Sequence, residues 1–347
     1  MKAALLYGKE DVRIQDIEVP GISKEEILLK TKSAAVCGTD VRMFTNGYKN
    51  VSPDNPLVLG HELSGTVARV GEHVKGYREG MRVAVAPNMG CGLCDLCVSG
   101  NTHLCGDYQA FGISIPGGFA EYVRIPEAAI RQGNVVEISD NVSFEEAALT
   151  EPLSCVYNAF ERAEIRLGDD VLILGAGPIG LMHAMMVKKG GAAKVILADP
   201  SVERLEFAKN LDNDYYTFHV NEVKTQIDKL TSGKGVDVCI TANPSPKAQI
   251  MALEVTAING RVSYFGGIPA DSDLSGINTN LIHYKQLIVS GTTRQSISQF
   301  RKILKLISDN VLDVNPLITN TYEVSQVQDA IFGIMNGKGV KHSVSFE

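Results

Sequence analysis

"DVLILGAGPIGLM", residues 170–182, joins an apolar run to a glycine-rich turn and then to a segment with helical spacing. Within it, Gly175, Gly177 and Gly180 form the pattern G-x-G-x-x-G. The first glycine permits a tight turn, the second lets backbone N–H groups approach a pyrophosphate, and the third lets helix and strand pack closely. The helix N-terminus adds partial positive charge for the phosphates. We therefore predict a dinucleotide-binding unit built on this stretch.

Asp199 ends the next apolar run, "KVILAD", residues 194–199. A carboxylate there accepts hydrogen bonds from the adenosine ribose and repels a 2′-phosphate, so we predict NAD as the cofactor rather than NADP. Arg204 is a candidate partner for such a phosphate, and a helix N-cap is the alternative role of Asp199. The predicted cofactor-binding residues are Gly175, Gly177, Pro178, Ile179, Gly180, Asp199 and Arg204.

The pattern of apolar residues divides the chain. Residues 1 to about 150 contain short β-branched segments separated by Gly, Pro and Asp, which favours an all-β unit of the barrel or sandwich kind. After them, apolar runs alternate with helix-length segments, which is typical of a parallel sheet with helices on both faces. The tail is more helical and ends in the strand-like "KHSVSFE", residues 341–347. The predicted fold class is therefore α/β.

Composition excludes several classes of partner. The 347 residues are 44% hydrophobic and 21% charged, as in an ordinary globular protein of about two domains. Net charge is −7 and no basic run occurs, so we expect no nucleic acid and no membrane surface as partner. The most apolar segment, residues 171–187, is glycine-interrupted and shorter than the ~20 residues of a membrane span. The opening residues lack the pattern of an export signal, so we expect a cytoplasmic location.

A dense cysteine loop, "GCGLCDLCVSGNTHLCG", spans residues 90–106. In a reducing compartment, clustered cysteines are more often metal ligands than disulfides. Overlapping C-x-x-C pairs threaded by glycines also differ from a thioredoxin-like redox pair. Four thiolates close a tetrahedron around Zn²⁺ and leave no position for a substrate, so we predict a structural zinc on this loop. Its ligands are Cys91, Cys94, Cys97 and Cys105.

A second set of potential ligands lies upstream. "AAVCGTDVR" contains Cys37, and "LVLGHELSG" contains His61 and Glu62. A cysteine, a histidine and a carboxylate form the open, three-ligand arrangement expected of a catalytic zinc. Taken singly, Cys37 and His61 have the alternative of being buried core residues. Their occurrence in one chain with the cysteine loop and the dinucleotide pattern favours the metal site.

Six separated motifs agree in order and spacing with one known family. "CGTD", "GHE", the four-cysteine loop, "GGFAEY" (117–122), "EPLS" (151–154) and "GAGPIG" resemble the zinc-containing medium-chain alcohol/polyol dehydrogenases over essentially the whole chain. The resemblance is to the sorbitol dehydrogenase-like, sugar-alcohol branch. It implies a GroES-like β-barrel catalytic domain, residues 1–152 and 294–347, and a Rossmann NAD-binding domain with a doubly wound parallel sheet, residues 153–293.

The resemblance also assigns roles residue by residue. It implies a catalytic zinc on Cys37 and His61, with Glu62 and Glu151 as direct or water-mediated ligands, and thus two zinc ions per chain. Thr39 would relay a proton outward, and the alternative role of its hydroxyl is to cap the backbone. A solvated helix start is the alternative for Glu151. The two remaining cysteines, Cys155 and Cys239, lie in apolar runs and are expected in the core.

The expected reaction transfers a hydride between a secondary alcohol of a polyol and NAD. In the sugar-alcohol branch the residue that matches Arg294 helps to bind substrate hydroxyls, and a surface salt bridge is its alternative. Many relatives carry histidine where this chain has Arg42, whose guanidinium suits an anionic group.

Three other functions stay open at this level. Sugar-alcohol phosphate dehydrogenases of the galactitol or arabitol phosphate type share most motifs, and Arg42, Lys49 or Arg294 would serve a phosphate. Threonine 3-dehydrogenases share "CGTDV" and "GHE". A non-catalytic NAD-binding zinc scaffold is the alternative from another class, although such a protein has no need of Cys37 and His61. The family further implies a homodimer or homotetramer.

Overall fold

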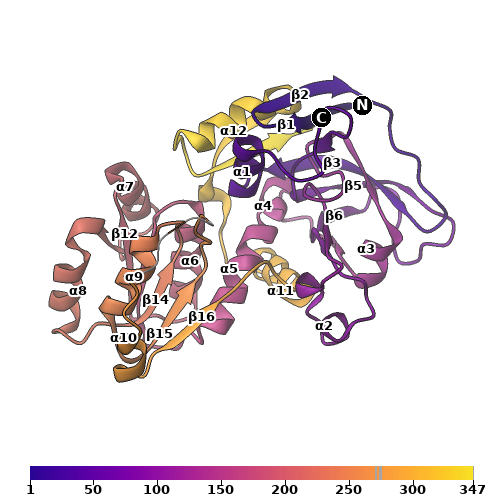
Figure 1. Cartoon of the computed structure of the whole chain (residues 1–347). Coiled ribbons are helices and arrows are strands. Elements are labelled where there is room, and N and C mark those ends of the chain that lie inside the picture. The colour runs from indigo at the N-terminus through magenta and orange to yellow at the C-terminus, as the bar shows by residue number, and fades with distance from the viewer. Residues whose placement is uncertain (270–271, 273–275, 347) are drawn as a thin grey trace. The chain divides into compact units, whose positions relative to one another are not determined.

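The computed structural model describes residues 1–269, 272 and 276–346 of the chain. The chain forms two compact units. One unit comprises Met1–Ser154 together with Arg294–Glu347, and the other comprises Cys155–Thr293. Both ends of the chain thus belong to the same unit, as the colours of Figure 1 show.

The Cys155–Thr293 unit is built on a six-stranded sheet in the order β13-β12-β11-β14-β15-β16, in which every neighbouring pair is parallel. Ranked along the chain, this is the order 3-2-1-4-5-6 of a doubly wound dinucleotide-binding fold. Ligands bind such sheets outside the carboxyl ends of the strands, where the strand order reverses between β11 and β14. The strands are β11 (Asp170–Leu174), β12 (Lys194–Asp199), β13 (Tyr216–His219), β14 (Val236–Thr241), β15 (Thr256–Tyr264) and β16 (Ile288–Gly291).

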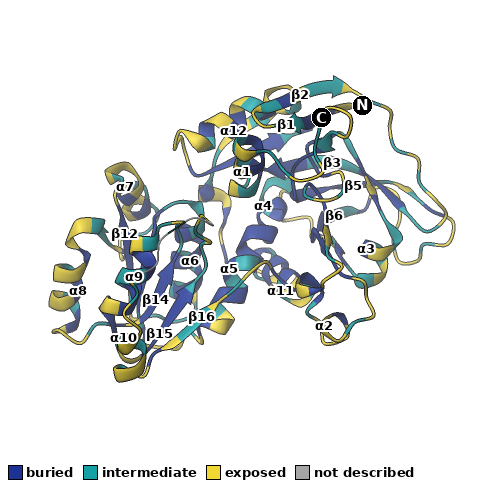
Figure 2. Ribbon diagram, viewed as in Figure 1, coloured by how far each residue is buried: buried dark blue, intermediate teal, exposed yellow. Residues whose placement is uncertain are grey.

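Helices connect these strands, which confirms the predicted parallel sheet. Helices α6 and α7 pack against β12, and α9 packs against β14 and β15. The central strands are buried along their length, shown in dark blue in Figure 2. Cys239, in β14, is fully buried as expected, whereas Cys155 is only half-buried. The helices are α6 (Pro178–Lys189), α7 (Val202–Leu211), α8 (Val223–Thr231), α9 (Pro246–Val255) and α10 (Thr279–Tyr284).

The other unit contains a mixed sheet in the order β10-β6-β5-β3-β18-β17, with β9 also paired to β3. Two smaller sheets, β2-β1-β4 and β7-β8, accompany it. The strands are β1 (Lys2–Gly8), β2 (Asp11–Asp16), β3 (Ile27–Ala35), β4 (Leu57–Val58), β5 (Glu62–Val70), β6 (Arg82–Val85), β7 (Asn88–Met89), β8 (Gln109–Ala110), β9 (Tyr122–Ile125), β10 (Val135–Glu137), β17 (Ile318–Glu323) and β18 (Lys341–Ser345).

The first 150 residues are rich in strands, as predicted, but short helices interrupt the strands. The most consequential is α1, which begins directly after Cys37. Asp40 explains its start, since its side chain accepts a hydrogen bond from the Cys37 backbone N–H and caps the first turn. The helices outside the dinucleotide-binding sheet are α1 (Gly38–Asn46), α2 (Asp95–Val98), α3 (Glu127–Gln132), α4 (Phe144–Ala148), α5 (Thr150–Arg162), α11 (Ile297–Ser308) and α12 (Val327–Met335).

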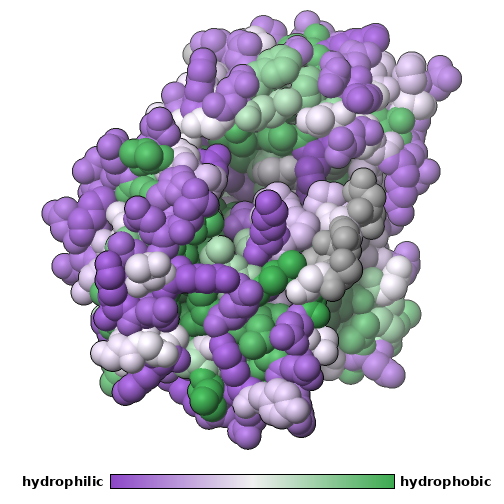
Figure 3. Space-filling model, turned by 60° about the vertical axis from the view of Figure 1, so that its left-hand side comes forward, coloured by the Kyte–Doolittle hydropathy of each residue, from purple (hydrophilic) through white to green (hydrophobic). Residues whose placement is uncertain are grey.

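The surface carries both polar and apolar residues, as the composition of an ordinary globular protein predicts. On the face drawn in Figure 3, hydrophilic residues lie around and between separate groups of hydrophobic ones. Within the part of the chain that the structure describes, no helix combines the length and the apolar character needed to cross a membrane.

Gly180 provides a test of the dinucleotide-binding turn. A Cβ at this position would overlap the carbonyl oxygen of Gly175. We expect Gly180→Ala to lower the free energy of unfolding by about 3 kcal/mol, at the upper end of overpacking costs, and to weaken cofactor binding. Gly21→Ala is the matched control, because a Cβ there meets nothing within 4 Å. Equal stability of the two variants in urea unfolding would show that the turn tolerates a side chain.

Candidate active site and metal centres

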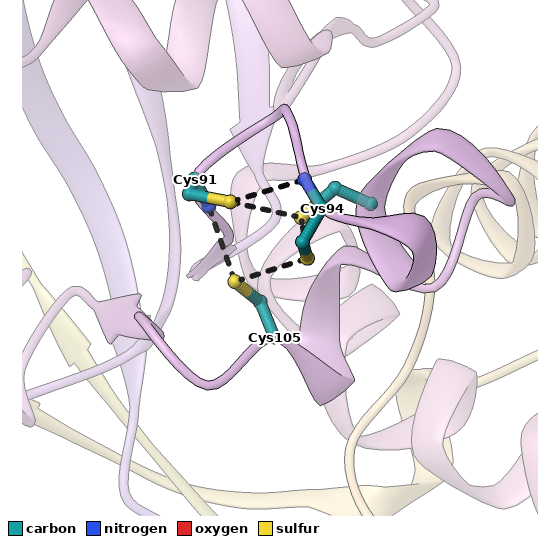
Figure 4. A group of neighbouring side chains, drawn as sticks. Cys91, Cys94 and Cys105 are labelled. Carbon is teal, nitrogen blue, oxygen red and sulfur yellow. Dashed lines mark hydrogen bonds between the residues drawn. The ribbon is translucent and has the colours of Figure 1, made fainter.

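The four cysteines of the loop converge on one point. Cys91 and Cys94 follow β7, Cys97 lies in α2, and Cys105 follows a short 3₁₀ turn. Cys94 Sγ lies 3.5 Å from Cys97 Sγ and 3.7 Å from Cys105 Sγ, and Cys91 Sγ lies 4.0 Å from Cys97 Sγ. Figure 4 shows the labelled side chains of Cys91, Cys94 and Cys105 pointing toward one another.

These sulfur distances fit a metal rather than disulfides. A zinc ion with Zn–S bonds of ~2.3 Å places tetrahedral sulfurs about 3.8 Å apart, within the observed range. The cysteines are free, and their sulfurs are far beyond the ~2.05 Å of a disulfide bond. The backbone N–H groups of Leu93 and Cys94 donate to Cys91 Sγ and lower the pKa of that thiol to about 6. These two N–H groups thus favour the thiolate form of Cys91, which is the form that binds a metal.

Strand pairing gathers the second group of ligands. Cys37 follows β3, and His61 and Glu62 stand where β5 begins. Because β3 and β5 are antiparallel with Ala35 opposite Glu62, the end of one strand lies beside the start of the other. The ligand atoms of Cys37, His61 and Glu62 all lie within 4.8 Å of one another. One sulfur, one nitrogen and one carboxylate are the donor set of an open zinc site.

Asp40 supports this group and was given no role by the sequence analysis. Its buried carboxylate accepts hydrogen bonds from the backbone N–H groups of Cys37 (2.8 Å) and Gly60 (3.3 Å). Its Oδ1 atom also lies 3.6 Å from His61 Nδ1, which leaves the other ring nitrogen available as a ligand. Burial lowers the pKa of His61, but Cys37 and Asp40 outweigh burial, so the pKa lies well above its ordinary value. The charges of Cys37 and Asp40 thus favour a cation at His61.

Glu62 also forms an ion pair with the buried amine of Lys341, a contact that the sequence pattern did not indicate. Lys341 Nζ lies 2.8 Å from Glu62 Oε1 and 2.6 Å from Oε2. Burial raises the pKa of Glu62 and nearby Glu151 raises it further, whereas Lys341 lowers it. Glu151, in the first turn of α5, is buried rather than solvated at a helix start. The negative charge of Glu151 thus interacts with that of Glu62.

Thr39 and Arg294 have partners of their own. The half-buried Thr39 accepts a hydrogen bond at Oγ1 from the exposed guanidinium of Arg42, at 3.0 Å. Arg294 Nη1 donates to the carbonyl of His103 at 2.8 Å, and its guanidinium stacks 3.8 Å from the Tyr108 ring centroid. These contacts place Arg294 against the end of the cysteine loop. Its predicted contact with a substrate stays a prediction.

The dinucleotide turn holds Asp199 at the end of β12. Its Oδ2 atom accepts from Ala176 N at 2.8 Å, and its Oδ1 atom accepts from Ser201 N at 2.9 Å. Ser201, not Asp199, is the N-cap of α7. Arg204 Nη1 lies 3.8 Å from Asp199 Oδ2 and 3.7 Å from where a Cβ of Gly177 would stand. Pro178 occupies the first turn of α6, followed by Ile179 and Gly180. The structure thus brings the predicted cofactor-binding residues together.

Cys97 tests the closed metal site. We expect Cys97→Ser to release one zinc per chain and to lower stability by more than about 4 kcal/mol, as loss of a structural metal does, while the folded fraction keeps its activity per molecule. Zinc content by mass spectrometry, thermal unfolding and specific activity measure this. Cys155→Ser, which removes a thiol outside both clusters, is the control and should keep its zinc. Immediate loss of activity with unchanged stability would contradict the structural role.

Comparison with known proteins agrees with this architecture. Residues 23–140 match the family described as "Alcohol dehydrogenase GroES-like domain", and residues 178–309 match "Zinc-binding dehydrogenase". The chain is 32% identical over 334 residues to a sorbitol dehydrogenase of Bacillus subtilis, covering 95% of this chain and 92% of the relative. It is 32% identical over 354 residues to an L-threonine 3-dehydrogenase of Yersinia pestis, covering 100% of both chains.

A solved structure shows the same fold. Galactitol-1-phosphate dehydrogenase from Escherichia coli matches with a TM-score of 0.90 and 26% identity, covering 100% of both chains. The predicted combination of a GroES-like domain with a Rossmann domain is thereby confirmed. The chain belongs to the zinc-containing medium-chain alcohol/polyol dehydrogenase family, and it is an NAD(P)-dependent oxidoreductase.

Proposed function

We propose that the protein oxidises a secondary alcohol of a polyol and reduces NAD, or runs the reverse reaction. The observation that carries this proposal is the donor set of Cys37, His61 and Glu62, which is open where the four-cysteine set is closed. Zinc held by these residues would supply the Lewis acidity that makes a substrate hydroxyl more acidic near neutral pH. NAD held at the glycine turn and Asp199 would supply the hydride acceptor, so the alcohol would lose a hydride from its carbon and a proton from its hydroxyl and become a ketone.

The chain's own residues order the site around this reaction. Asp40 fixes the backbone at Cys37 and faces the ring of His61, and so orients two ligands at once. Glu151 interacts electrostatically with Glu62, and each of these two carboxylates is a candidate direct or water-mediated ligand. The Thr39 hydroxyl is the candidate for passing the substrate proton outward, since it lies two residues from Cys37 and is half-buried.

Several observations favour a polyol as the substrate. The "EPLS" motif and the similarity to sorbitol dehydrogenases of Bacillus subtilis and Bombyx mori both favour a sugar alcohol. A phosphorylated polyol is the second candidate, because the guanidinium of Arg42 donates to Thr39 and presents a permanent positive charge there. Threonine is the third, from the L-threonine 3-dehydrogenase relatives.

The proposal includes NAD, two zinc ions per chain and a reducing, cytoplasmic location. Four unpaired cysteines at metal-ligand distances support the zinc and the reducing surroundings. The homodimer or homotetramer stays a prediction, and sedimentation measures this oligomeric state directly. The lack of a nucleic-acid or membrane partner also stays a prediction.

Cys37 tests the open site. We expect Cys37→Ser to lower turnover by at least about 10³-fold, because the variant loses the several kcal/mol that a Lewis acid contributes to the transition state. The Kd for NAD, measured by fluorescence titration, should change by no more than a factor of two, or roughly 0.4 kcal/mol. The reason is that the predicted NAD-binding residues belong to the other unit. The assay is NADH formation on a panel of polyols, polyol phosphates, threonine and short alcohols. Retained activity in Cys37→Ser would contradict the assignment of Cys37 as a ligand of the catalytic zinc. Cys155→Ser serves as the control.

Asp199 tests cofactor choice. We expect Asp199→Asn to weaken NAD binding and to raise the preference for NADP over NAD by roughly 10-fold or more, the effect of losing hydrogen bonds to a charged acceptor. The side-chain amide of this variant keeps one oxygen that accepts a hydrogen bond from a backbone N–H. Arg204 then no longer faces the negative charge of the Asp199 carboxylate. Glu203→Gln, one residue before Arg204, is the matched control. The ratio of kcat/KM values for NAD and NADP is the measurement, and wild-type preference for NADP would overturn the proposal.

A further inference from the structure

The ammonium group of Lys341 is fully buried and fully hydrogen-bonded. Lys341 is 4% exposed, and Glu62 is 0% exposed. Its Nζ atom has three protons and three acceptors, namely Glu62 Oε1 at 2.8 Å, Glu62 Oε2 at 2.6 Å and the Val36 carbonyl at 2.8 Å. A buried lysine is costly unless it is paired in this way. Removing the ammonium would therefore leave the buried Glu62 carboxylate without this partner.

The backbone delivers Lys341 to this place. β18 pairs antiparallel with β3, with Ser343 opposite Ala35, and Val36 N donates to the His342 carbonyl at 2.9 Å. The ammonium thus binds the chain directly before Cys37 as well as the side chain of Glu62. One cation from β18 thus holds Glu62 and the residue that directly precedes Cys37.

Each Glu62 oxygen already accepts a charged hydrogen bond. A carboxylate oxygen so engaged is a weaker donor to a metal, and an ammonium this close also repels a second cation. Glu151 supplies a further negative charge that interacts with Lys341. The charge of Lys341 thus offsets part of the attraction between these carboxylates and a metal ion.

We propose that Lys341 is a positioning residue that competes with the catalytic metal for Glu62. Because Lys341 holds Glu62, Glu62 can leave the metal. An exogenous molecule can then take the coordination position of Glu62. Without the ammonium, Glu62 has the metal as its main cationic partner and closes the site. The inference rests on the proposed metal-dependent function but not on the identity of the substrate.

The experiment uses the full-length protein with Co²⁺ in place of the zinc proposed at Cys37, His61 and Glu62. In Lys341→Met we expect Co²⁺ to dissociate about 10-fold more slowly, the scale of effects from residues that support metal ligands. The visible spectrum of Co²⁺ should also lose its response to added imidazole, and turnover should fall. Lys341→Arg, which keeps the charge and two donors for Glu62, should restore the imidazole response. Faster loss of Co²⁺, or an unchanged rate and response, would overturn the proposal.

Two further variants separate positioning from stability. Arg261→Met breaks another buried ion pair, in which Arg261 Nη2 donates to Asp169 Oδ1 at 2.7 Å, and should destabilise the protein without altering the Co²⁺ spectrum. In a Glu62→Gln background, adding Lys341→Met should leave Co²⁺ dissociation unchanged, because the carboxylate is gone. If Lys341→Met alone does not fold, Lys341→Gln takes its place in both backgrounds, because its amide keeps a hydrogen-bond donor but carries no charge. Slower dissociation only where Glu62 is present supports the proposal, whereas the same change in both backgrounds contradicts it. None of these Co²⁺ readouts depends on which alcohol the enzyme oxidises.

Discussion

The pairing of β18 with β3 is the constraint on which the open metal site depends. It places the last strand of the chain beside a strand from its beginning, in the register Ser343 opposite Ala35. The same β3 pairs with β5 in the register Ala35 opposite Glu62. These two registers bring the end of β3, the start of β5 and Lys341 into hydrogen-bonding contact. A shift of one residue in either register would turn the side chains to the other face of the sheet.

Coordination number then separates the two candidate metal sites. Four thiolates complete a tetrahedron, so the cysteine loop can stabilise the fold but offers no position to a reactant. Cys37, His61 and Glu62 provide three donors of three chemical kinds, and their supporting groups are polar and charged. Asp40 restrains His61, and Lys341 restrains Glu62. We therefore propose that the conspicuous cysteine cluster holds the structural metal, and that the chemistry belongs to Cys37, His61 and Glu62, each of which is inconspicuous singly.

Local signals in the sequence predicted much of this arrangement. The glycine turn, Asp199 and the cysteine loop are each readable within a short window, because turn geometry and metal ligation impose fixed spacings. Helix α1 was missed because Asp40 caps it through its side chain, a contact that the β-like composition around it does not reveal. Lys341 was missed for a different reason: 279 residues separate it from Glu62, and no local pattern marks a lysine as buried. The contact of Arg294 with the His103 carbonyl is another pairing that only the tertiary fold creates.

The central claim is that one chain carries a closed, all-sulfur zinc site and an open, mixed-ligand zinc site. Zinc K-edge X-ray absorption on the zinc-loaded protein, together with the zinc content per chain, tests it most directly. We expect two zinc ions with five sulfur ligands in total, four from the cysteine loop and one from Cys37, and nitrogen and oxygen ligands completing the second site. A single zinc per chain, or two zinc ions with sulfur ligands alone, would contradict it.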